Sequence, residues 1–504
     1  MTLAIVYSRG RAGIEAPLVT VEVHISNGLP SLSIVGLPET AVKESKDRVR
    51  GALLNSGFEF PAQRITVNLA PADLPKEGGR FDLAIALGIL AASKQLPASA
   101  LAPYECVGEL SLSGELRSIT GVLPIAIQAH KQARKLLLPQ DNWTEAALIK
   151  GIKLFPAAHL LDVCAHLTGQ RVIEANDQPA NSQETCFSVD FSDVHGHFQV
   201  KRALEIAAAG AHNLLMLGPP GTGKSMLAAR LPTILPELTE HQAQETAAIA
   251  SISDQGLIIA SWRKPPFRAP HHSASAAALV GGGSHPKPGE ISLAHNGALF
   301  LDELPEFDRK VLEVLREPLE TGHITISRAN KRADFPARFQ LIAAMNPCPC
   351  GYLGDATGRC HCTSEQIMRY RAKISGPLLD RIDMHLDVPK VSHAVIRNGS
   401  PGGEEASASI RKRVVAARQK AVERSGKTNS ALSAKEVKQL CKLSDADHQL
   451  LEQAMDKFAL SHRAYHRILK LARSIADLAD SESIERSHLT EAISYRKLDR
   501  SDKI

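Results

Sequence analysis

The 504-residue sequence predicts a multidomain α/β protein with an α+β N-terminal domain, a parallel-sheet core and an all-helical C-terminal region. Three observations predict this class. Strand-like and helical runs are mixed over residues 1–168, whereas apolar strand-like runs alternate with helices over residues 189–392. Over residues 393–504 the runs are helical, and several follow a capping serine. Residues 169–188 are polar and lack helical periodicity, so they are predicted to form a linker.

The overall composition is that of a globular protein, because 44% of the residues are apolar and 22% are charged. The chain starts without the basic and apolar pattern of a signal peptide, and no apolar run approaches the roughly 20 residues that span a bilayer. We therefore expect a soluble, cytoplasmic protein with no membrane contact. The formal net charge of +5 permits a polyanionic partner without requiring one.

The N-terminal part contains three runs that predict strands, VTVEVHI, RITVNLAP and KLLLP. The run PETAVKESKDRVRGALLNSG predicts a helix, because its apolar residues share one face while its lysines and arginines occupy the other. The apolar residues of that face are Val42, Val49, Leu53 and Leu54. This mixture of elements predicts an α+β domain.

In the core, the runs LLMLG, ALFLDE and FQLIAAMNP predict buried strands of a parallel sheet. A β-hairpin with HITIS and FPARFQ as its arms is expected just before the last of these strands. In the C-terminal part, helices are expected to begin near Ile410, Ala434, Asp445, His462 and Ser487.

The segment GPPGTGKS matches the P-loop pattern G-x-x-x-x-G-K-[ST], and it follows an apolar strand and opens a helix, as a P-loop must. Glycines let the backbone N–H groups surround phosphates, Lys224 neutralises β- and γ-oxygens, and Ser225 offers its hydroxyl to Mg²⁺. The predicted nucleotide-binding residues are Gly218, Pro219, Pro220, Gly221, Thr222, Gly223, Lys224, Ser225 and Met226. ATP and Mg²⁺ are therefore the expected cofactors.

Two further strands of the core end in polar residues. Asp302 and Glu303 follow ALFL, where Asp302 is expected to hold a Mg²⁺-bound water and Glu303 to orient the attacking water. The alternative is an ordinary surface strand end. Asn346 follows the strand FQLIAAM, at the place of a γ-phosphate sensor.

Five motifs in order, GPPGTGKS, GEISLAHNGALFLDELPEF, LIAAMNPCPCG, ISGPLLDRID and SHRAYHRILKLARSIADL, resemble the AAA+ ATPases of the magnesium-chelatase type and most closely the ComM/YifB family. The resemblance covers essentially the whole chain and implies a homo-hexameric ring with ATP bound between neighbours. It also implies that Arg381 is an arginine finger and that Arg463 is the second sensor arginine of the helical lid. The alternative for each is an ordinary salt-bridged helix arginine.

The predicted hairpin carries Arg328, Lys331 and Arg332 at its tip, and in the related MCM helicases a hairpin at this place points into the central channel. Cations repeated round a ring would track a phosphate backbone without reading its sequence. The alternative is a solvated turn. Lys287, near the end of a glycine-containing insertion that lines the pore in such relatives, is a further DNA-binding candidate.

The same insertion contains His271 and His272. No carboxylate or thiolate stands beside them at ligand spacing, so we expect packing or loop hydrogen bonding rather than metal binding. The cysteines of residues 348–362, unlike these two histidines, stand near other potential metal ligands. Cys348, Cys350, Cys360 and Cys362 form two C-x-C pairs, which predict a structural zinc site. Four free thiols are the alternative.

The N-terminal domain resembles the Lon protease domain through VGELSLSGELRSITGVLPIA and LPKEGGRFDLAIALG. Where the protease has its serine, this chain has Arg80, Phe81 and Asp82, and no lysine follows at the corresponding distance. Without a serine–lysine pair there is no activated nucleophile, so the domain is expected to be proteolytically inactive. A binding or assembly role, as in RadA-type recombination proteins, is the more plausible interpretation.

The resemblance implies an ATP-dependent hexameric DNA motor, a helicase that promotes branch migration in homologous recombination and natural transformation. Single-stranded or branched DNA is the expected partner, with recombination proteins as further candidates. Two alternatives stay open, since an ATPase core does not name its substrate. One is a magnesium-chelatase-like motor for metal insertion, and the other is an AAA+ chaperone that remodels proteins.

Overall fold

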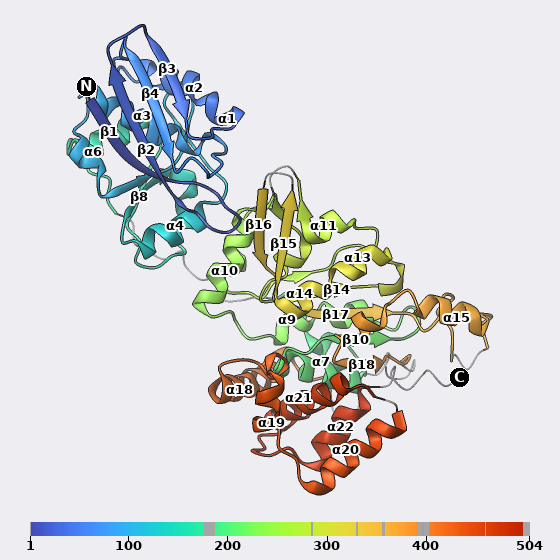
Figure 1. The fold of residues 1–504 in the computed structure, drawn as a ribbon. Helices are drawn as coiled ribbons and strands as arrows, with labels where there is room; N and C mark the ends of the chain where they lie inside the picture. Colours follow the sequence, from blue (N-terminus) through green and yellow to red (C-terminus); the bar gives the residue numbers. More distant parts are fainter. Residues whose placement is uncertain are drawn as a thin grey trace. The chain divides into compact units, whose positions relative to one another are not determined.

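The computed structural model describes residues 2–175, 187–283, 286–328, 331–354, 358–391, 395, 397, 403–458 and 460–496. The chain forms two compact units (Figure 1). The first contains Met1–Glu184 and Ala243–Trp262, and the second contains Thr185–Gln242 and Arg263–Ile504. Residues 176–186 of the predicted linker lie outside the described part of the chain.

The first unit is built on a mixed seven-stranded sheet in the order β3-β4-β2-β1-β5-β8-β9. Strand β2 pairs antiparallel with both β1 and β4, and the remaining neighbours are parallel. The strands are β1 (Thr2–Arg9), β2 (Leu18–Ser26), β3 (Ser31–Val35), β4 (Arg64–Ala70), β5 (Tyr104–Cys106), β8 (Lys135–Pro139) and β9 (Leu154–Ala157). Short strands β6 (Glu109–Leu110) and β7 (Leu116–Arg117) pair with each other. The three predicted strand runs correspond to β2, β4 and β8.

The helices of the first unit are α1 (Thr40–Lys43), α2 (Ser45–Asn55), α3 (Asp82–Ala92), α4 (Val122–Lys131), α5 (Trp143–Ala146) and α6 (Leu160–Leu167). Every residue of α3 is buried, and the helix packs on β1 and β2. The predicted helix near residue 45 is divided at Glu44 into α1 and α2. Val42, Val49 and Leu53 are buried as expected, but Leu54 is 49% exposed, so its placement on the apolar face was wrong.

A segment distant in sequence completes this unit. Helix α10 (Glu240–Ser251) and the following residues pack against α4 and α5, and Ala247 is fully enclosed there among apolar side chains. Leu257, Ile259 and Trp262 pack on the same cluster at its edge. The sequence-based division placed residues 243–262 in the core domain, because nothing local in their pattern indicates which apolar surface they cover.

The second unit contains a five-stranded sheet in the order β11-β14-β17-β10-β18, in which every pair is parallel. Its strands are β10 (Leu214–Leu217), β11 (Phe267–Arg268), β14 (Ala298–Leu301), β17 (Gln340–Met345) and β18 (Met384–Asp387). All residues of β10, β14 and β17 are buried, as strands covered on both faces must be. The predicted parallel-sheet core is confirmed.

Helices precede and join the strands of this sheet (Figure 1). They are α7 (Phe198–Gly210), α8 (Lys224–Ala228), α9 (Leu231–Ile234), α11 (Ala276–Val280), α12 (Glu290–Leu293), α13 (Arg309–Val314), α14 (Arg316–Thr321), α15 (Ser364–Arg371) and α16 (Gly376–Leu379). Two hairpins project from the same connections, β12 (Gly281–Gly282) with β13 (Lys287–Pro288) and β15 (His323–Arg328) with β16 (Lys331–Pro336).

The second arm of the β15–β16 hairpin differs from the prediction. The arm was expected over FPARFQ, but β16 covers Lys331–Pro336 and β17 begins at Gln340. Proline has no backbone N–H to donate to a ladder, so Pro336 ends β16 and the chain crosses to β17 through Ala337–Phe339.

The helices in the described part of the C-terminal region are α18 (Ser407–Ser425), α19 (Ala434–Leu440), α20 (Asp445–Phe458), α21 (His462–Leu478) and α22 (Arg486–Ser494). The side chains of Ser433 and Ser461 accept hydrogen bonds from the first turns of α19 and α21, as N-caps do. The predicted all-helical region is confirmed. None of the helices in the described ranges combines the length and the apolar composition that crossing a membrane requires.

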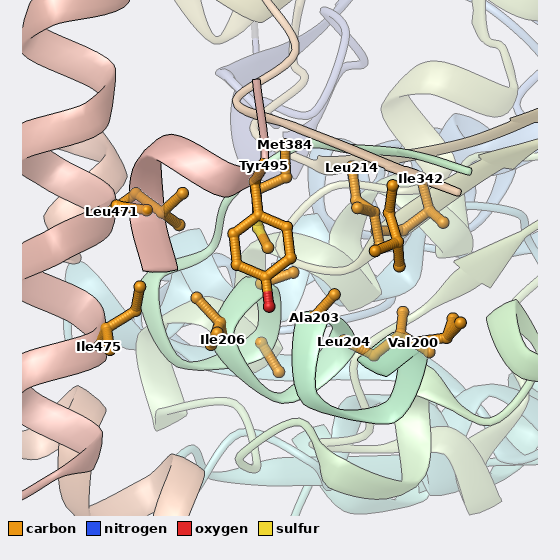
Figure 2. Close-up of a cluster of buried hydrophobic side chains, with 14 of the residues drawn as sticks. Val200, Ala203, Leu204, Ile206, Leu214, Ile342, Met384, Leu471, Ile475 and Tyr495 are labelled. Carbon is orange, nitrogen blue, oxygen red and sulfur yellow. The ribbon is translucent and has the colours of Figure 1, made fainter. Parts of the chain in front are cut away.

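One apolar core joins the parallel sheet to these helices. Figure 2 shows Tyr495, which follows α22, among side chains from α7, β10, β17, β18 and α21. Leu471 and Ile475 of α21 are fully or almost fully buried there, and each such side chain stabilises the fold by roughly 1.5–3 kcal/mol. The backbone N–H of His385 donates to the carbonyl of Tyr495 over 2.7 Å, which extends the edge of the sheet into the helical region.

Candidate nucleotide-binding site

The P-loop runs from the end of β10 to the start of α8. Gly221 and Gly223 have φ values of 74° and 81°, a conformation that favours glycine. A Cβ atom at Gly218 would lie 2.4 Å from the carbonyl oxygen of Val388, so only glycine fits at that position. Gly223 immediately precedes Lys224, the first residue of α8. The loop therefore has the curled shape that turns backbone N–H groups toward an anion at a helix N-terminus.

The Lys224 ammonium group lies within the loop. Its Nζ donates to the carbonyls of Gly218 and Pro219 over 2.7 and 2.9 Å, and lies 3.3 Å from the Oδ1 atom of Asn346. Burial lowers the pKa of Lys224, whereas the charges of Asp302 and Glu303 act in the opposite direction. Lys224, Asp302 and Asn346 follow β10, β14 and β17, which are neighbours in the sheet, and the three side chains therefore lie close together.

Ser225 and Asp302 are in direct contact, because the Ser225 hydroxyl donates to the Asp302 carboxylate. A hydroxyl and a carboxylate oxygen side by side are the ligands that Mg²⁺ takes in nucleotide sites, where it keeps several waters and binds phosphate oxygens as well. These residues fit Mg²⁺–ATP.

Glu303 follows Asp302 in the left-handed region, with φ 51°, and its backbone N–H donates to the Asp302 carboxylate over 2.9 Å. Its own carboxylate is 50% exposed and lies 3.2 Å from Nδ1 of His272. His272 comes from the connection between β11 and α11. The sequence indicated loop hydrogen bonding for this histidine but gave no partner for it.

The four cysteines lie next to this site. Their sulfur atoms all fall within 4.8 Å of one another, and the Cys348–Cys350, Cys348–Cys360 and Cys350–Cys360 separations are 3.3, 3.7 and 3.6 Å. Tetrahedral Zn–S bonds of about 2.3 Å place sulfurs about 3.8 Å apart, whereas a disulfide requires about 2.05 Å. The cysteines therefore fit a metal ion better than a disulfide.

The cysteine cluster is also tied to the P-loop by packing. Cys348 is buried two residues after Asn346. Gly351 faces the loop so closely that a Cβ atom there would lie 2.7 Å from Cδ of Pro220. Tyr370 also interacts with the backbone of Asn346, and burial raises the pKa of this tyrosine to about 12. The cluster thus supports both the Asn346 segment and the P-loop.

Arg381 and Arg463 lie together on Glu320. Both guanidinium groups reach its Oε1 atom, Arg381 in close contact and Arg463 over 3.4 Å. Arg381 is 7% exposed and also donates to the carbonyl of Pro377. The hydrogen bond from Arg381 lowers the pKa of Glu320. Among the contacts recorded for the described residues, neither arginine pairs with a P-loop residue of its own chain.

A cavity of about 960 Å³ opens beside these arginines, between the sheet and the C-terminal helices. Its charged lining includes Glu320, Arg381, Asp383, Arg463, Arg467 and Lys470. Arg467 pairs with Asp383. Burial acts to raise the pKa of Asp383, but Arg467 and His212 outweigh it, so that pKa lies well below its ordinary range. The sequence did not indicate Glu320, Asp383 or Arg467, because their partners are distant along the chain.

The DNA-binding candidates lie on the two hairpins. Arg328 pairs with Lys331 in the backbone register, so both flank the turn of the β15–β16 hairpin. The side chains of Arg328, Lys331 and Arg332 lie outside the described part of the structure. Lys287 pairs with Gly282 in the β12–β13 hairpin.

Comparison with known proteins agrees with this architecture. The family model of the magnesium chelatase subunit ChlI matches residues 190–396, a second ChlI model matches residues 21–142, and a C-terminal ChlI model matches residues 404–496. A partial relative, the magnesium-chelatase 38 kDa subunit of Rhodobacter capsulatus, is 27% identical over 31% of this chain and 50% of its own length.

Two other relatives match the whole chain. The competence protein ComM of Haemophilus influenzae is 54% identical over 99% of this chain and 98% of its own. The uncharacterized protein YifB of Escherichia coli is 51% identical over the same shares of the two chains. With its parallel P-loop sheet and helical C-terminal region, the chain belongs to the ComM/YifB family of magnesium-chelatase-type AAA+ ATPases.

Proposed function

We propose that this protein is a hexameric, ATP-driven DNA motor, a helicase that promotes branch migration in recombination and natural transformation. The family implies ATP and Mg²⁺ as ligands. The observation that carries the proposal is the match to a competence protein along 99% of the chain, including both hairpins and the N-terminal unit. The magnesium-chelatase subunit instead matches only 31% of the chain.

The residues that follow the carboxyl ends of β10, β14 and β17 can carry out the hydrolytic step. In this step water attacks the terminal phosphorus of ATP, and the phosphoanhydride bond to ADP is broken. Lys224 neutralises the phosphates, and Ser225 and Asp302 would hold Mg²⁺. Glu303 would orient the attacking water, and Asn346, whose Oδ1 atom lies 3.3 Å from Nζ of Lys224, would contact the terminal phosphate.

Ring assembly would complete the site. Arg381 and Arg463 share one glutamate, and within the described ranges neither pairs with the P-loop of its own chain. A cation that stabilises the transferred phosphoryl group must lie close to the oxygens of that group. Because Arg381 and Arg463 do not pair with the described P-loop residues of their own chain, we propose that they act on the nucleotide of the neighbouring subunit. In this arrangement a ring hydrolyses ATP and a separate subunit does not.

The hairpins are the proposed DNA contacts. Arg328, Lys331 and Arg332 belong to a hairpin that directly follows α14, the helix that carries Glu320. The β12–β13 hairpin adds Lys287. Cations on such loops, repeated in each subunit, bind a phosphate backbone independently of sequence.

We also propose that Cys348, Cys350, Cys360 and Cys362 bind one zinc ion. The sulfur separations support tetrahedral coordination, and four protein ligands leave no open position for catalysis. The ion would be structural and would fix the segment that carries Asn346 and packs on Pro220.

The test compares ATP hydrolysis by the purified chain alone, with a synthetic four-way DNA junction, with an unfolded protein, and with a porphyrin-binding partner protein. We expect the junction to stimulate hydrolysis and to be converted to separated duplex arms in an ATP-dependent reaction. A ring that neither binds nor responds to branched DNA contradicts the DNA-motor proposal. Stimulation by unfolded protein would then favour remodelling, and stimulation by a porphyrin-binding partner would favour metal insertion.

A further inference from the structure

We infer that His272 is a positioning residue for ATP hydrolysis, in which Nδ1 donates a hydrogen bond to Glu303 and holds its carboxylate in place for the attacking water. The inference rests on the ATPase part of the proposed function. It assigns a chemical role to a histidine that lies outside the P-loop and outside the strand ends that carry the other polar residues of the site.

Glu303 needs an external support because its own surroundings do not fix it. The carboxylate is half exposed, and the backbone at this residue is in the left-handed region, where it serves as the entry to a 3₁₀ turn over Leu304–Glu306. The backbone N–H of Glu303 donates a hydrogen bond to the Asp302 carboxylate and so does not orient the Glu303 side chain. Among the described residues, His272 is the one side chain recorded as an ion-pair or hydrogen-bond partner of the Glu303 carboxylate.

His272 is itself held from two sides. Its ring lies 4.1 Å, centroid to centroid, from the ring of His271, and it meets the edge of Phe307 at 6.5 Å and 83°. Phe307 is 3% exposed and directly follows the 3₁₀ turn that Glu303 opens. The Glu303 loop therefore supplies both the packing partner of the histidine and a carboxylate 3.2 Å from its Nδ1 atom.

The contact joins two functional parts of the subunit. His272 lies four residues after β11, and the chain then enters α11 and the β12–β13 hairpin with Lys287. Fewer than ten residues separate His272 from the β12–β13 hairpin, so a displacement of the hairpin would also move His272. Glu303, in contrast, follows β14 closely and is fixed to the sheet. The 3.2 Å contact between Nδ1 of His272 and the Glu303 carboxylate thus links the insertion to the residue proposed to orient water.

The two interactions of His272, ring packing and hydrogen bonding, can be separated by substitution. Asn places its amide N–H near the position of Nδ1 but has no ring, so His272→Asn keeps the donor and loses the packing. His272→Phe keeps a ring against His271 and Phe307 and loses the donor. His272→Ala loses both.

The experiment measures kcat and KM for ATP hydrolysis by the full-length ring, with binding of ATP and hexamer formation as controls. We expect His272→Ala and His272→Phe to lower kcat about tenfold or more with KM within about twofold, because a misplaced catalytic group affects the transition state. His272→Asn should retain activity within about threefold of the wild type. In a Glu303→Gln background, His272→Ala should have no further effect, as expected for residues that act together.

Full activity of His272→Phe, or loss of activity in His272→Asn alone, shows that the ring packs and does not position Glu303. A rise in kcat for His272→Ala also overturns the inference. If the wild-type ring hydrolyses ATP and Glu303→Gln does not, either result leaves the ATPase proposal intact. Absence of hydrolysis in the wild type contradicts the proposed function itself.

Discussion

The P-loop end of the sheet and the Glu320 cluster differ in how they are built and in what they lack. At the P-loop end, Lys224, Asp302 and Asn346 follow neighbouring parallel strands, Lys224 contacts Asn346, and Ser225 contacts Asp302. At Glu320, Arg381 and Arg463 converge on a carboxylate, beside a large open cavity. The first brings together the residues proposed to bind Mg²⁺–ATP, whereas the second holds two arginines that are paired with a carboxylate and are proposed to reach the phosphate of another subunit.

This difference is what the proposed action of Arg381 on the nucleotide of a neighbouring subunit requires. A carboxylate between two arginines keeps them near each other without a nucleotide, at the cost of an ion pair that a phosphate would have to replace. The two halves of the hydrolytic site thus sit at different places on one chain.

Arg381→Ala should have the largest effect, a loss of about 10³-fold in kcat, because arginine fingers contribute at least this much to phosphoryl transfer. Mixing Arg381→Ala subunits with Lys224→Ala subunits should restore part of the activity, since some interfaces then pair an intact finger with an intact P-loop. ATP hydrolysis is measured across mixing ratios. Mixed rings that form but recover nothing would place Arg381 on its own nucleotide or outside the chemistry.

Changes at the P-loop end should separate binding from hydrolysis. Lys224→Ala should lose ATP binding, because the removed ammonium faces the phosphates. Glu303→Gln should bind ATP, stay assembled and lose about 10²-fold in kcat, since the amide does not accept the proton of the attacking water. Equilibrium binding of a labelled nucleotide and steady-state hydrolysis distinguish the two. Wild-type turnover by Glu303→Gln would show that another residue orients the water.

The hairpin should affect DNA and not the nucleotide. Replacing Arg328, Lys331 and Arg332 with Ala should reduce the log–log salt slope of DNA binding by about 0.7 to 0.9 for each phosphate that the hairpin no longer neutralises. DNA-independent hydrolysis should be nearly unchanged. A matched control replaces Lys435, Lys438 and Lys442, which are exposed on and beside α19 and carry the same charge. If the control variant weakens DNA binding equally, net charge and not the hairpin determines affinity.

The zinc proposal predicts the smallest effect on catalysis and a clear effect on stability. The purified chain should contain about one zinc per subunit, and Cys348→Ser/Cys350→Ser should remove this zinc and lower the Tm. Changing the buried pair Cys106→Ala/Cys164→Ala should leave the zinc content unchanged, because these residues lie in the first unit. Metal analysis and thermal unfolding provide the measurements. Metal-free protein with an unchanged Tm would favour four free thiols.

Local chemistry explains which features could be read from the sequence. The P-loop is contiguous, the strand ends are marked by polar residues after apolar runs, and Ser433 and Ser461 cap helices within three residues of themselves. Leu54 was misplaced because helical periodicity indicates an apolar face without showing how far the neighbouring surface extends. The second hairpin arm was predicted too far along the chain, because Pro336, which cannot donate a backbone hydrogen bond, ends the strand.

Contacts between distant residues could not be read in this way. Glu320 is 143 residues from Arg463, and the His272–Glu303 pair joins two loops whose proximity depends on the strand order. Neither pair has a spacing that distinguishes it from solvated charges on a surface. The sequence indicated the chemical groups of the site, and the arrangement of the parallel strands determined which of them meet.

The apolar core around Tyr495 has a mechanical consequence. Because one set of side chains belongs to β10, β17, β18, α7 and α21 at once, the helical region cannot swing away from the sheet without exposing that core to water. The sheet and the helical region of the second unit should therefore move as one rigid body. In the proposed ring, bending would then occur at the contacts between neighbouring subunits and not between these two layers.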